Sequence, residues 1–360
     1  MSNANPIQSS LWRRLRKNPG AVFGIVLISI SVLVAVFAYV LAPDHSPDAN
    51  RMTLEIGGQK PGFHQSFLLI RKPRPPVSKS RIAAWFTGED DRYEYIPIDS
   101  WKQERDSLIV NKFIDEGIVE RRSYFHPPAD PGMQIKKKTF WLGTDRYGRD
   151  ILSRLIIGVR VSLAVGLITV LLSLSIGILL GALAGYFGGR TDHILMWFLN
   201  VIWSIPTLLL VFALTLLLGK GFWQVFIAIG LTMWVSVARI VRGQVLAVKQ
   251  LEYVEAARAM GYSTFRIIGK HILPNIMGPV LVIAASNFAS AIVIEAGLSF
   301  LGIGVQPPQP SWGLMIKENY NFIITHNPML ALVPGFAIML LVLAFNLLGN
   351  GLRDALNVKE

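Results

Sequence analysis

Six long apolar runs limit what this chain of 360 residues can fold into. The first, Gly20–Ala42, holds no charged residue, and five more follow at roughly 161–186, 194–219, 222–241, 276–303 and 329–348. A helix needs about 20 apolar residues to cross a hydrocarbon layer of about 30 Å, and each run reaches that length. Only 16% of the residues are charged, against about 25% in an average soluble domain. The sequence therefore predicts an all-α membrane protein with about six transmembrane helices.

Basic residues beside these runs predict the orientation of the chain. Arg13, Arg14, Arg16 and Lys17 precede the first run, and Lys and Arg favour the cytoplasmic side. Residues 1–19 are therefore expected to form a cytoplasmic N-terminal segment and 20–42 transmembrane helix 1. Six crossings return the C-terminus to the cytoplasm and place the basic loop 242–274 inside. A cleaved signal peptide is disfavoured, because the run exceeds the usual 7 to 15 or so apolar residues and lacks an A-x-A site.

Residues 44–140 differ from the rest of the chain. They hold 14 of the 23 acidic residues and many prolines, and they follow a helix that leaves the cytoplasm. Alternation at Phe67–Ile70 predicts short strands, whereas the spacing of Trp101, Leu108 and Phe113 within 98–122 predicts a helix. We therefore expect a small α+β extracytoplasmic insert between helices 1 and 2. The RKPRPP stretch at 71–76 predicts an extended linker, because proline disfavours helix in itself and in its predecessor.

Several classes of function find no support in the residues. The net charge of +12 lies in short clusters beside apolar runs, which is untypical of a nucleic-acid surface. The chain has no cysteine and only six histidines, with no H-E-x-x-H pair, so we expect no metal site. It has no G-x-x-x-x-G-K-[ST] loop, and its apolar runs hold no convincing catalytic pair. We expect no catalytic residue and no cofactor bound by this chain.

The loop between the fourth and fifth runs reads QLEYVEAARAMGYSTFRIIGKHILPN and is too polar to span a membrane. Good helix formers surround Glu255, and Gly261 is a natural helix stop. Ser263 suits the cap of a second short helix, and Pro274 suits the start of the next helix. The loop is therefore predicted to form a helix, a bend and a second helix at the membrane surface.

Within this loop, the Glu-Ala-Ala triplet, the glycine four residues later and the Leu-Pro pair resemble the EAA loop of ABC importer permeases. In that family the loop is the coupling helix that docks into a cytoplasmic ATPase. The resemblance implies the following ATPase-coupling residues: Glu255, Ala256, Ala257, Gly261, Leu273 and Pro274. The chain departs from the general pattern at His271-Ile272. The alternative is that the triplet belongs to an ordinary amphipathic helix at the interface.

Two further stretches resemble signatures of the peptide and nickel subfamily. WLGTDRYGRDILSRLIIGVRVSL, at 141–163, matches the LGTDxxGRDxxSRxxxGxRxSL pattern of dipeptide, oligopeptide and nickel permeases. We interpret its charges as pairs in the headgroup zone that fix the start of the second span, in preference to direct contacts with substrate. The residues with this structural role are Gly143, Asp145, Gly148, Arg149, Asp150 and Arg160.

EAGLSFLGIGVQPPQPSWGLM, at 295–315, is similar to the LSFLGxGxxPPxPSWGxM region of the second permease subunit of peptide importers. Its glycines and prolines must end the helix. Glu295 is the only acid inside an apolar run, and a carboxylate there is costly in lipid. Two roles stay open for Glu295: a place in the translocation path, or pairing between helices.

Two features concern helix packing. Gly177, Gly181 and Gly185 repeat at the small-xxx-small spacing that lets helices approach closely. Ser204 and Pro206, in the third run, predict a kink in that helix.

The resemblance covers 141–355 closely, and it implies the type I permease fold of ABC importers for that core. It leaves 44–140 without a family account. The implied partners are a homologous permease in a heterodimer, two cytoplasmic ABC ATPases that carry ATP and Mg, an extracytoplasmic solute-binding protein and the lipid bilayer. The implied place is the cytoplasmic (inner) membrane of a bacterium, with both termini in the cytoplasm. The alternatives are nickel or another small solute as cargo, and a receptor or scaffold that transports nothing.

Overall fold

The computed structural model describes residues 6–74, 76, 79–125, 132–219, 221–325 and 327–356. The chain divides into two compact units. The first, here called the helical unit, comprises Met1–Val32, Ser162–Gln306 and Ile338–Glu360. The second, the mixed unit, comprises Leu33–Val161 and Pro307–Ala337.

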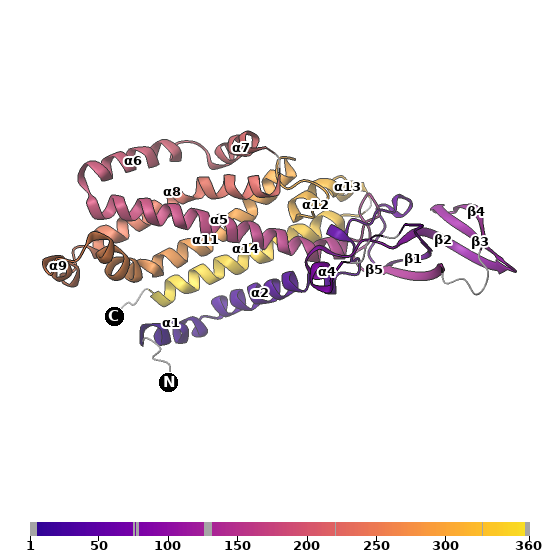
Figure 1. Ribbon diagram of the computed structural model, residues 1–360, viewed down its shortest axis with the longest axis horizontal. Helices are drawn as coiled ribbons and strands as arrows, with labels where there is room; N and C mark the ends of the chain where they lie inside the picture. Colours follow the sequence, from indigo (N-terminus) through magenta and orange to yellow (C-terminus); the bar gives the residue numbers. More distant parts are fainter. Residues whose placement is uncertain are drawn as a thin grey trace. The chain divides into compact units, whose positions relative to one another are not determined.

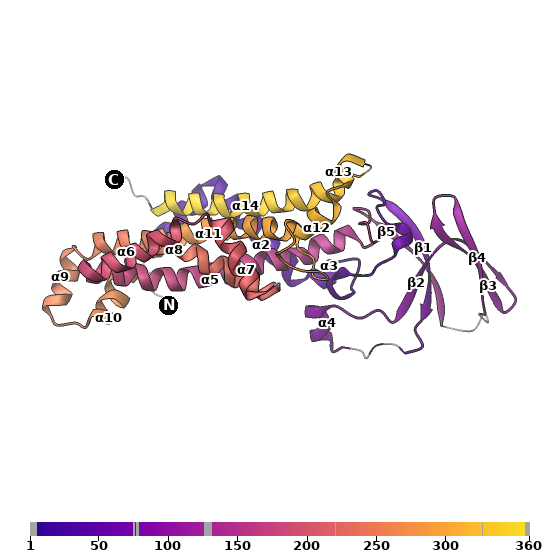
Figure 2. The ribbon, with the colours of Figure 1, turned by 90° about the horizontal axis from the view of Figure 1, so that it is seen from above.

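Long helices make up the helical unit (Figure 1). They are α1 (Pro6–Lys17), most of α2 (Pro19–Val36), the greater part of α5 (Ile151–Phe187), α6 (Gly189–Trp203), α7 (Thr207–Leu218), α8 (Phe222–Val248), α11 (Leu273–Phe300) and the end of α14 (Met329–Leu356). The short elements α9 (Glu252–Ala259), α10 (Thr264–Arg266) and the π-helical η3 (Ile267–Ile272) lie between α8 and α11 in the chain. Figure 2 shows α9 and α10 together at one end of this unit.

The predicted membrane spans are confirmed, with two refinements. Among the described residues, five helices are long and apolar enough to cross a membrane, or six if the bent pair α6 and α7 counts as one span. The first span is interrupted at Phe37, where α2 ends and the short α3 (Ala38–Leu41) follows. The third span bends by 88° between α6 and α7. Pro206, which has no N–H to continue the helix, lies in the break and immediately precedes α7, as the kink prediction requires.

The glycine repeat of α5 packs against α8. A Cβ added at Gly177 would lie 2.5 Å from Val237 Cβ, and one at Gly181 would lie 2.4 Å from the Ala238 carbonyl oxygen. Gly185 would meet Val245 in the same way, at 2.8 Å. These approaches are closer than any real Cβ contact, so the predicted close packing of the two helices is confirmed.

We predict opposite effects for two glycine-to-alanine substitutions in neighbouring helices. Gly181→Ala should destabilise the protein by about 1–3 kcal/mol, because the added methyl overpacks a closed interface. Gly243→Ala, in α8, should stabilise it by roughly 0.5–1 kcal/mol, because nothing lies within 4 Å of that methyl and alanine favours helix. Thermal unfolding of the two variants in one detergent measures the difference, and equal shifts would contradict the packing.

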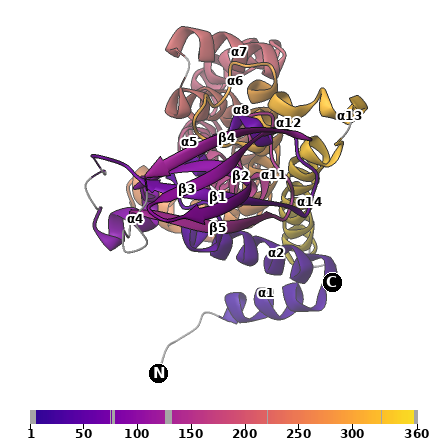
Figure 3. The same cartoon turned by 90° about the vertical axis from the view of Figure 1, so that its right-hand side faces the viewer.

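A five-stranded antiparallel sheet forms the core of the mixed unit (Figure 3). Its strand order is β4-β3-β2-β1-β5. The strands are β1 (Phe63–Arg71), β2 (Tyr93–Glu104), β3 (Ser107–Asp115), β4 (Ile118–Phe125) and β5 (Met133–Phe140). The short helices of this unit are α3, η1 (Pro47–Ala49), η2 (Leu54–Ile56), α4 (Arg81–Thr87), α12 (Trp312–Asn319) and α13 (Phe322–Thr325).

Alternating side chains give the sheet a small core on each face. Leu68 packs with Ile98 and Val110 on one side, and Phe67 packs with Leu69 and Phe140 on the other. Successive residues of a strand point to opposite faces, so the apolar run of β1 serves both cores. The predicted strand at Phe67–Ile70 is confirmed.

The predicted helix within 98–122 is wrong, because these residues form the end of β2, then β3 and most of β4. Leu108 and Val110 are buried at a spacing of two, which is the strand period. Gly117 has φ +78 in the turn between β3 and β4, a conformation that ends any helix there. The helical spacing of Trp101 and Phe113 was accidental, since Trp101 is exposed. Of the predicted linker at 71–76, Pro75 lies outside the described residues, and residues 72–74 and 76 form no helix or strand.

Candidate functional site

The loop between α8 and α11 has the predicted helix-bend-helix form. α9 ends at Ala259, and Gly261 follows with φ +74, a left-handed conformation that glycine adopts without strain. Ser263 is at the N-cap position of α10, although its side chain makes no capping hydrogen bond there. Pro274 lies in the first turn of α11, as predicted for a helix start.

One face of this loop is anchored to the helical unit and the other is open. Val254 and Ala257 are buried in a cluster with Val241, Ile267 and Ile272. Glu255, Ala256, Gly261 and Pro274 are exposed, and Leu273 is half-buried. Of the six residues predicted to couple, Ala257 therefore packs inside this chain and the others remain accessible.

The open face also carries large apolar side chains that the sequence reading missed. Leu251, Tyr253, Met260 and Phe265 are exposed, Phe265 to 83%. Apolar side chains gathered on one accessible loop are typical of a protein–protein contact. The sequence does contain a signal for this apolar surface. These large apolar residues stand in an otherwise polar stretch, and they do not lie on the helix face that carries the buried side chains of α9.

Two cavities lie along α8, α11 and α14 in the helical unit. One, of about 460 Å³, reaches from α6 and α7 to α14 and is lined by Trp203, Thr207, Thr232, Met233, Val235, Ser236, Ala289, Ser290, Val293, Ile294, Val342 and Asn346. The other, of about 400 Å³, is lined by Ile240, Pro279, Val282, Ile283, Ser286, Asn346, Gly349, Asn350, Arg353 and Leu356. Asn346 belongs to both cavities, so they follow one another along the helices.

Nearly all of the polar side chains that line these two cavities are uncharged. The larger cavity has no charged side chain among its lining residues, and the other has Arg353 alone, near the end of α14. Ser236, Ser290 and Asn346 are exposed, although they belong to membrane-spanning helices. The Ser236 hydroxyl donates to the Met233 carbonyl oxygen of its own helix at 2.9 Å. An exposed hydroxyl or amide without such a partner finds none in lipid, so the wall at Ser290 and Asn346 is suited to water, solute or another protein.

This uncharged polar wall was also missed in the sequence. Ser286 and Ser290 are four residues apart in α11, and Asn346 and Asn350 are four apart in α14, which places each pair on one helix face. The pairs were visible as polar positions at helical spacing inside apolar runs. The sequence alone could not show which faces of these apolar helices are covered by other helices of the chain and which stay exposed.

Glu295 lies away from this wall. It is 1% exposed, and the Ser299 hydroxyl donates to its Oε1 at 2.6 Å. Ser299 Oγ in turn accepts from the Val305 N–H at 3.0 Å, which closes the turn after α11. These contacts join the end of α11 to the turn that follows it, and both roles given to Glu295, a place in the translocation path or pairing between helices, stay predictions.

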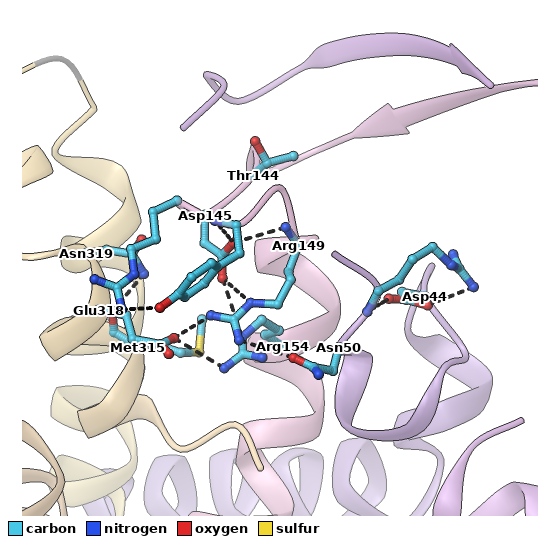
Figure 4. A network of polar contacts seen from close by, with 12 residues as sticks. Asp44, Asn50, Thr144, Asp145, Arg149, Arg154, Met315, Glu318 and Asn319 are labelled. Atoms are coloured by element: carbon cyan, nitrogen blue, oxygen red, sulfur yellow. Dashed lines mark hydrogen bonds and ion pairs between the residues drawn. The ribbon is translucent and has the colours of Figure 1, made fainter. Parts of the chain in front are cut away.

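The first subfamily signature forms a buried charge network in the mixed unit (Figure 4). Arg149 donates from Nε to Asp145 Oδ2 and from Nη2 to Glu318 Oε2, both at 2.5 Å. Arg154 Nη2 lies 3.5 Å from the same Glu318 oxygen. All four side chains are buried, and their charges balance. The structure thus supports the predicted pairing of Asp145 and Arg149.

Glu318, which completes this network, was not predicted. It lies in α12, more than 160 residues after the two arginines, so no local pattern links them. Two buried arginines need a second acid beside Asp145, because a buried charge needs a partner, but their burial is visible only in the structure.

The remaining signature residues hold the turn before α5. Gly143 and Gly148 have φ of +80 and +72, and a Cβ on Gly148 would lie 1.7 Å from the Thr53 carbonyl oxygen. Asp150 accepts from the Ser153 N–H at 3.0 Å at the start of α5. Arg160 donates to backbone carbonyl oxygens, among them Ala35 at 2.6 Å and Phe86 at 2.9 Å. All of these contacts are structural, in agreement with the interpretation of the signature.

We predict that Glu318→Gln destabilises the protein by about 3–5 kcal/mol, because it leaves two buried arginines with one carboxylate. Glu104→Gln is the matched control. It breaks an exposed pair with Lys102 and should change stability little or not at all. Denaturant unfolding followed by tryptophan fluorescence compares them, and similar midpoints for both variants would contradict the importance of the network.

Spanning helices with an uncharged polar wall, together with a loop whose one face is accessible, are the features that the comparisons with known proteins must explain. Residues 177–359 match the family described as binding-protein-dependent transport system inner membrane component. Residues 7–60 match the N-terminal transmembrane domain of oligopeptide transport permease C. The chain therefore belongs to the inner-membrane components of binding-protein-dependent transport systems, and its fold is that of this permease family.

Three curated relatives are identical to this chain at more than two fifths of the aligned positions. The dipeptide transport system permease protein DppC of Bacillus subtilis is 41% identical over 251 residues, which cover 70% of this chain and 77% of the relative. The glutathione transport system permease protein GsiD of Pectobacterium atrosepticum is 44% identical, over 61% of this chain and 72% of the relative. The oligopeptide transport system permease protein OppC of B. subtilis is 43% identical, over 62% and 72%.

Proposed function

We propose that this chain is a permease subunit of an ATP-driven peptide importer and forms half of the transmembrane path. The observation that carries the proposal is the match to three permeases named for dipeptide, oligopeptide and glutathione transport, at 41–44% identity. The chain itself transmits motion and hydrolyses nothing, whereas ATP and Mg belong to two partner ATPases. A homologous permease completes the path, and an extracytoplasmic binding protein delivers the peptide.

The cavity wall supports a peptide over nickel as cargo. A divalent metal ion exchanges its hydration shell for carboxylate, imidazole or thiolate ligands, and the larger cavity offers none of these among its lining residues. Hydroxyl and amide groups instead pair with the amides of a peptide backbone, whatever its side chains. Met233 and Trp203 add adaptable apolar surface beside them.

The loop that contains α9 is the proposed ATPase contact. Val254 and Ala257 fix it to the helical unit, so a push on its open face is transmitted to α8 and α11. Exposed Glu255 supplies a charged contact, and Met260 and Phe265 supply apolar ones. Rigid movement of this loop then opens the path alternately to each side of the membrane.

The proposed topology follows from the same assignment. Residues 1–19 and the loop 242–274 lie in the cytoplasm together with the C-terminus, and 44–140 form the extracytoplasmic insert. The transport core is 141–355, and the buried charge network of the mixed unit has a structural role. A receptor that transports nothing is disfavoured, because such a protein needs no ATPase to bind the exposed face of the loop.

We predict that the purified complex, reconstituted in liposomes with ATP inside, takes up a tripeptide and not nickel. Glu255→Lys should lower both ATPase copurification and tripeptide uptake by about tenfold or more, because reversing a charge in a fitted contact costs several kcal/mol. Asp354→Lys makes the same charge change on exposed α14 and should alter neither.

Nickel uptake without peptide uptake would reject the proposed cargo. Normal ATPase binding and uptake in Glu255→Lys, with the protein correctly inserted, would reject coupling through this loop.

A further inference from the structure

The mixed unit contains a separate small cavity of about 170 Å³. It lies among β1, β2, β5 and the turn before α5, and its polar lining includes Asp44, Arg51, Tyr95, Lys138 and Asp150. Its volume is below the roughly 300 Å³ at which cavities for drug-sized ligands begin. A ligand of this cavity is therefore small.

Lys138 is the more buried of the two lysines that line this cavity, and no carboxylate in the described part of the chain neutralises it at close range. Lys136 and Lys138 face the cavity from β5, while Lys137 points to the other side of the sheet. The Lys138 Nζ lies 4.5 Å from the centre of the Tyr95 ring, and no carboxylate of the described residues lies within ion-pair distance of it. Burial, and then the nearby Arg51, lower the pKa of Lys138 to about 8.

Arg51, in contrast, is already neutralised. Its guanidinium lies 3.1 Å from Asp44 and also pairs with Asp91, while it stacks 4.1 Å from the centre of the Tyr95 ring. Two carboxylates thus hold Arg51 in place. Lys138 is left as the cation that can meet a ligand anion.

Asp150 supplies a carboxyl oxygen that no donor meets. Burial raises the pKa of the Asp150 carboxyl, and an ammonium group beside it would favour the charged form. Its side chain is 6% exposed, and its Oδ2 accepts from Ser153, whereas its Oδ1 has no hydrogen-bond partner among the described residues. A buried carboxylate oxygen without a donor is costly and rare in a folded protein. Because Asp150 lines the cavity, a donor on a ligand can satisfy this oxygen.

We propose that this cavity binds a small α-amino acid as a zwitterion, with its ammonium group on Asp150 Oδ1 and its carboxylate on Lys138 Nζ. Lys138 and Asp150 both line the cavity, and the charge of Lys138 acts on the Asp150 carboxyl, although the two side chains form no ion pair among the described residues. An α-amino acid carries its ammonium and carboxylate groups on one carbon atom, so a single small molecule can meet both side chains. The rings of Phe67, Tyr95 and Phe140 give its carbon atoms an apolar surface.

The test is ligand-observed NMR titration of the full chain in lipid nanodiscs with L-alanine, acetate, methylammonium and trialanine. L-alanine should bind saturably, and the two single-charge probes should each bind about tenfold more weakly or not at all, because each makes one of the two charged contacts. Trialanine should not compete with L-alanine, because it exceeds the cavity.

Lys138→Met and Asp150→Asn should each weaken L-alanine binding by about tenfold or more. Asparagine keeps the oxygen that accepts from Ser153, so the start of α5 stays capped. Lys137→Met, on the opposite face of β5, is the matched control and should bind as the unaltered chain does. If Asp150→Asn does not fold, Lys138→Met decides. No saturable binding of L-alanine, equal binding of acetate, or full binding by Lys138→Met would overturn the proposal.

Discussion

A polar group inside a membrane must find a partner, and this requirement governs the structure from one end to the other. The long apolar helices satisfy their own backbone groups, which is why they can span. Where α11 and α14 carry hydroxyl and amide side chains on open surfaces, lipid cannot satisfy them. Water in a transport path, or a second permease packed against this surface, can supply their hydrogen-bond partners.

The same requirement explains the partners of polar residues outside this wall. Arg160 directs its donors to backbone carbonyl oxygens, and Glu295 pairs with Ser299 one helical turn away. Around Asp145 and Glu318, two acids and two arginines cancel each other's charge in a buried network. Such networks fix geometry more than they add stability, since apolar packing of similar volume often does as well. Their role is to hold the turn before α5 in one conformation.

Much of this organisation could be predicted from the sequence, because hydropathy and helix signals act over short stretches. The spans, the break at Pro206 and the bend at Gly261 all rest on local chemistry. The helix expected within 98–122 failed, because strand pairing decides between two periods that a short apolar pattern fits equally. Glu318 and the pairing of Asn346 with the wall of α11 were out of reach, since both depend on residues brought together by the fold from distant parts of the chain.

The central claim is that the uncharged polar wall faces water in the assembled transporter. The chain has no cysteine, so single cysteines can report it directly. Ser290→Cys and Asn346→Cys in the reconstituted complex should react with a membrane-impermeant thiol reagent, and a bound peptide should slow both reactions. Leu217→Cys, on the exposed apolar side of α7, should stay unreactive. Reaction at Leu217 with protection of Ser290 and Asn346, whether or not peptide is present, would contradict the account.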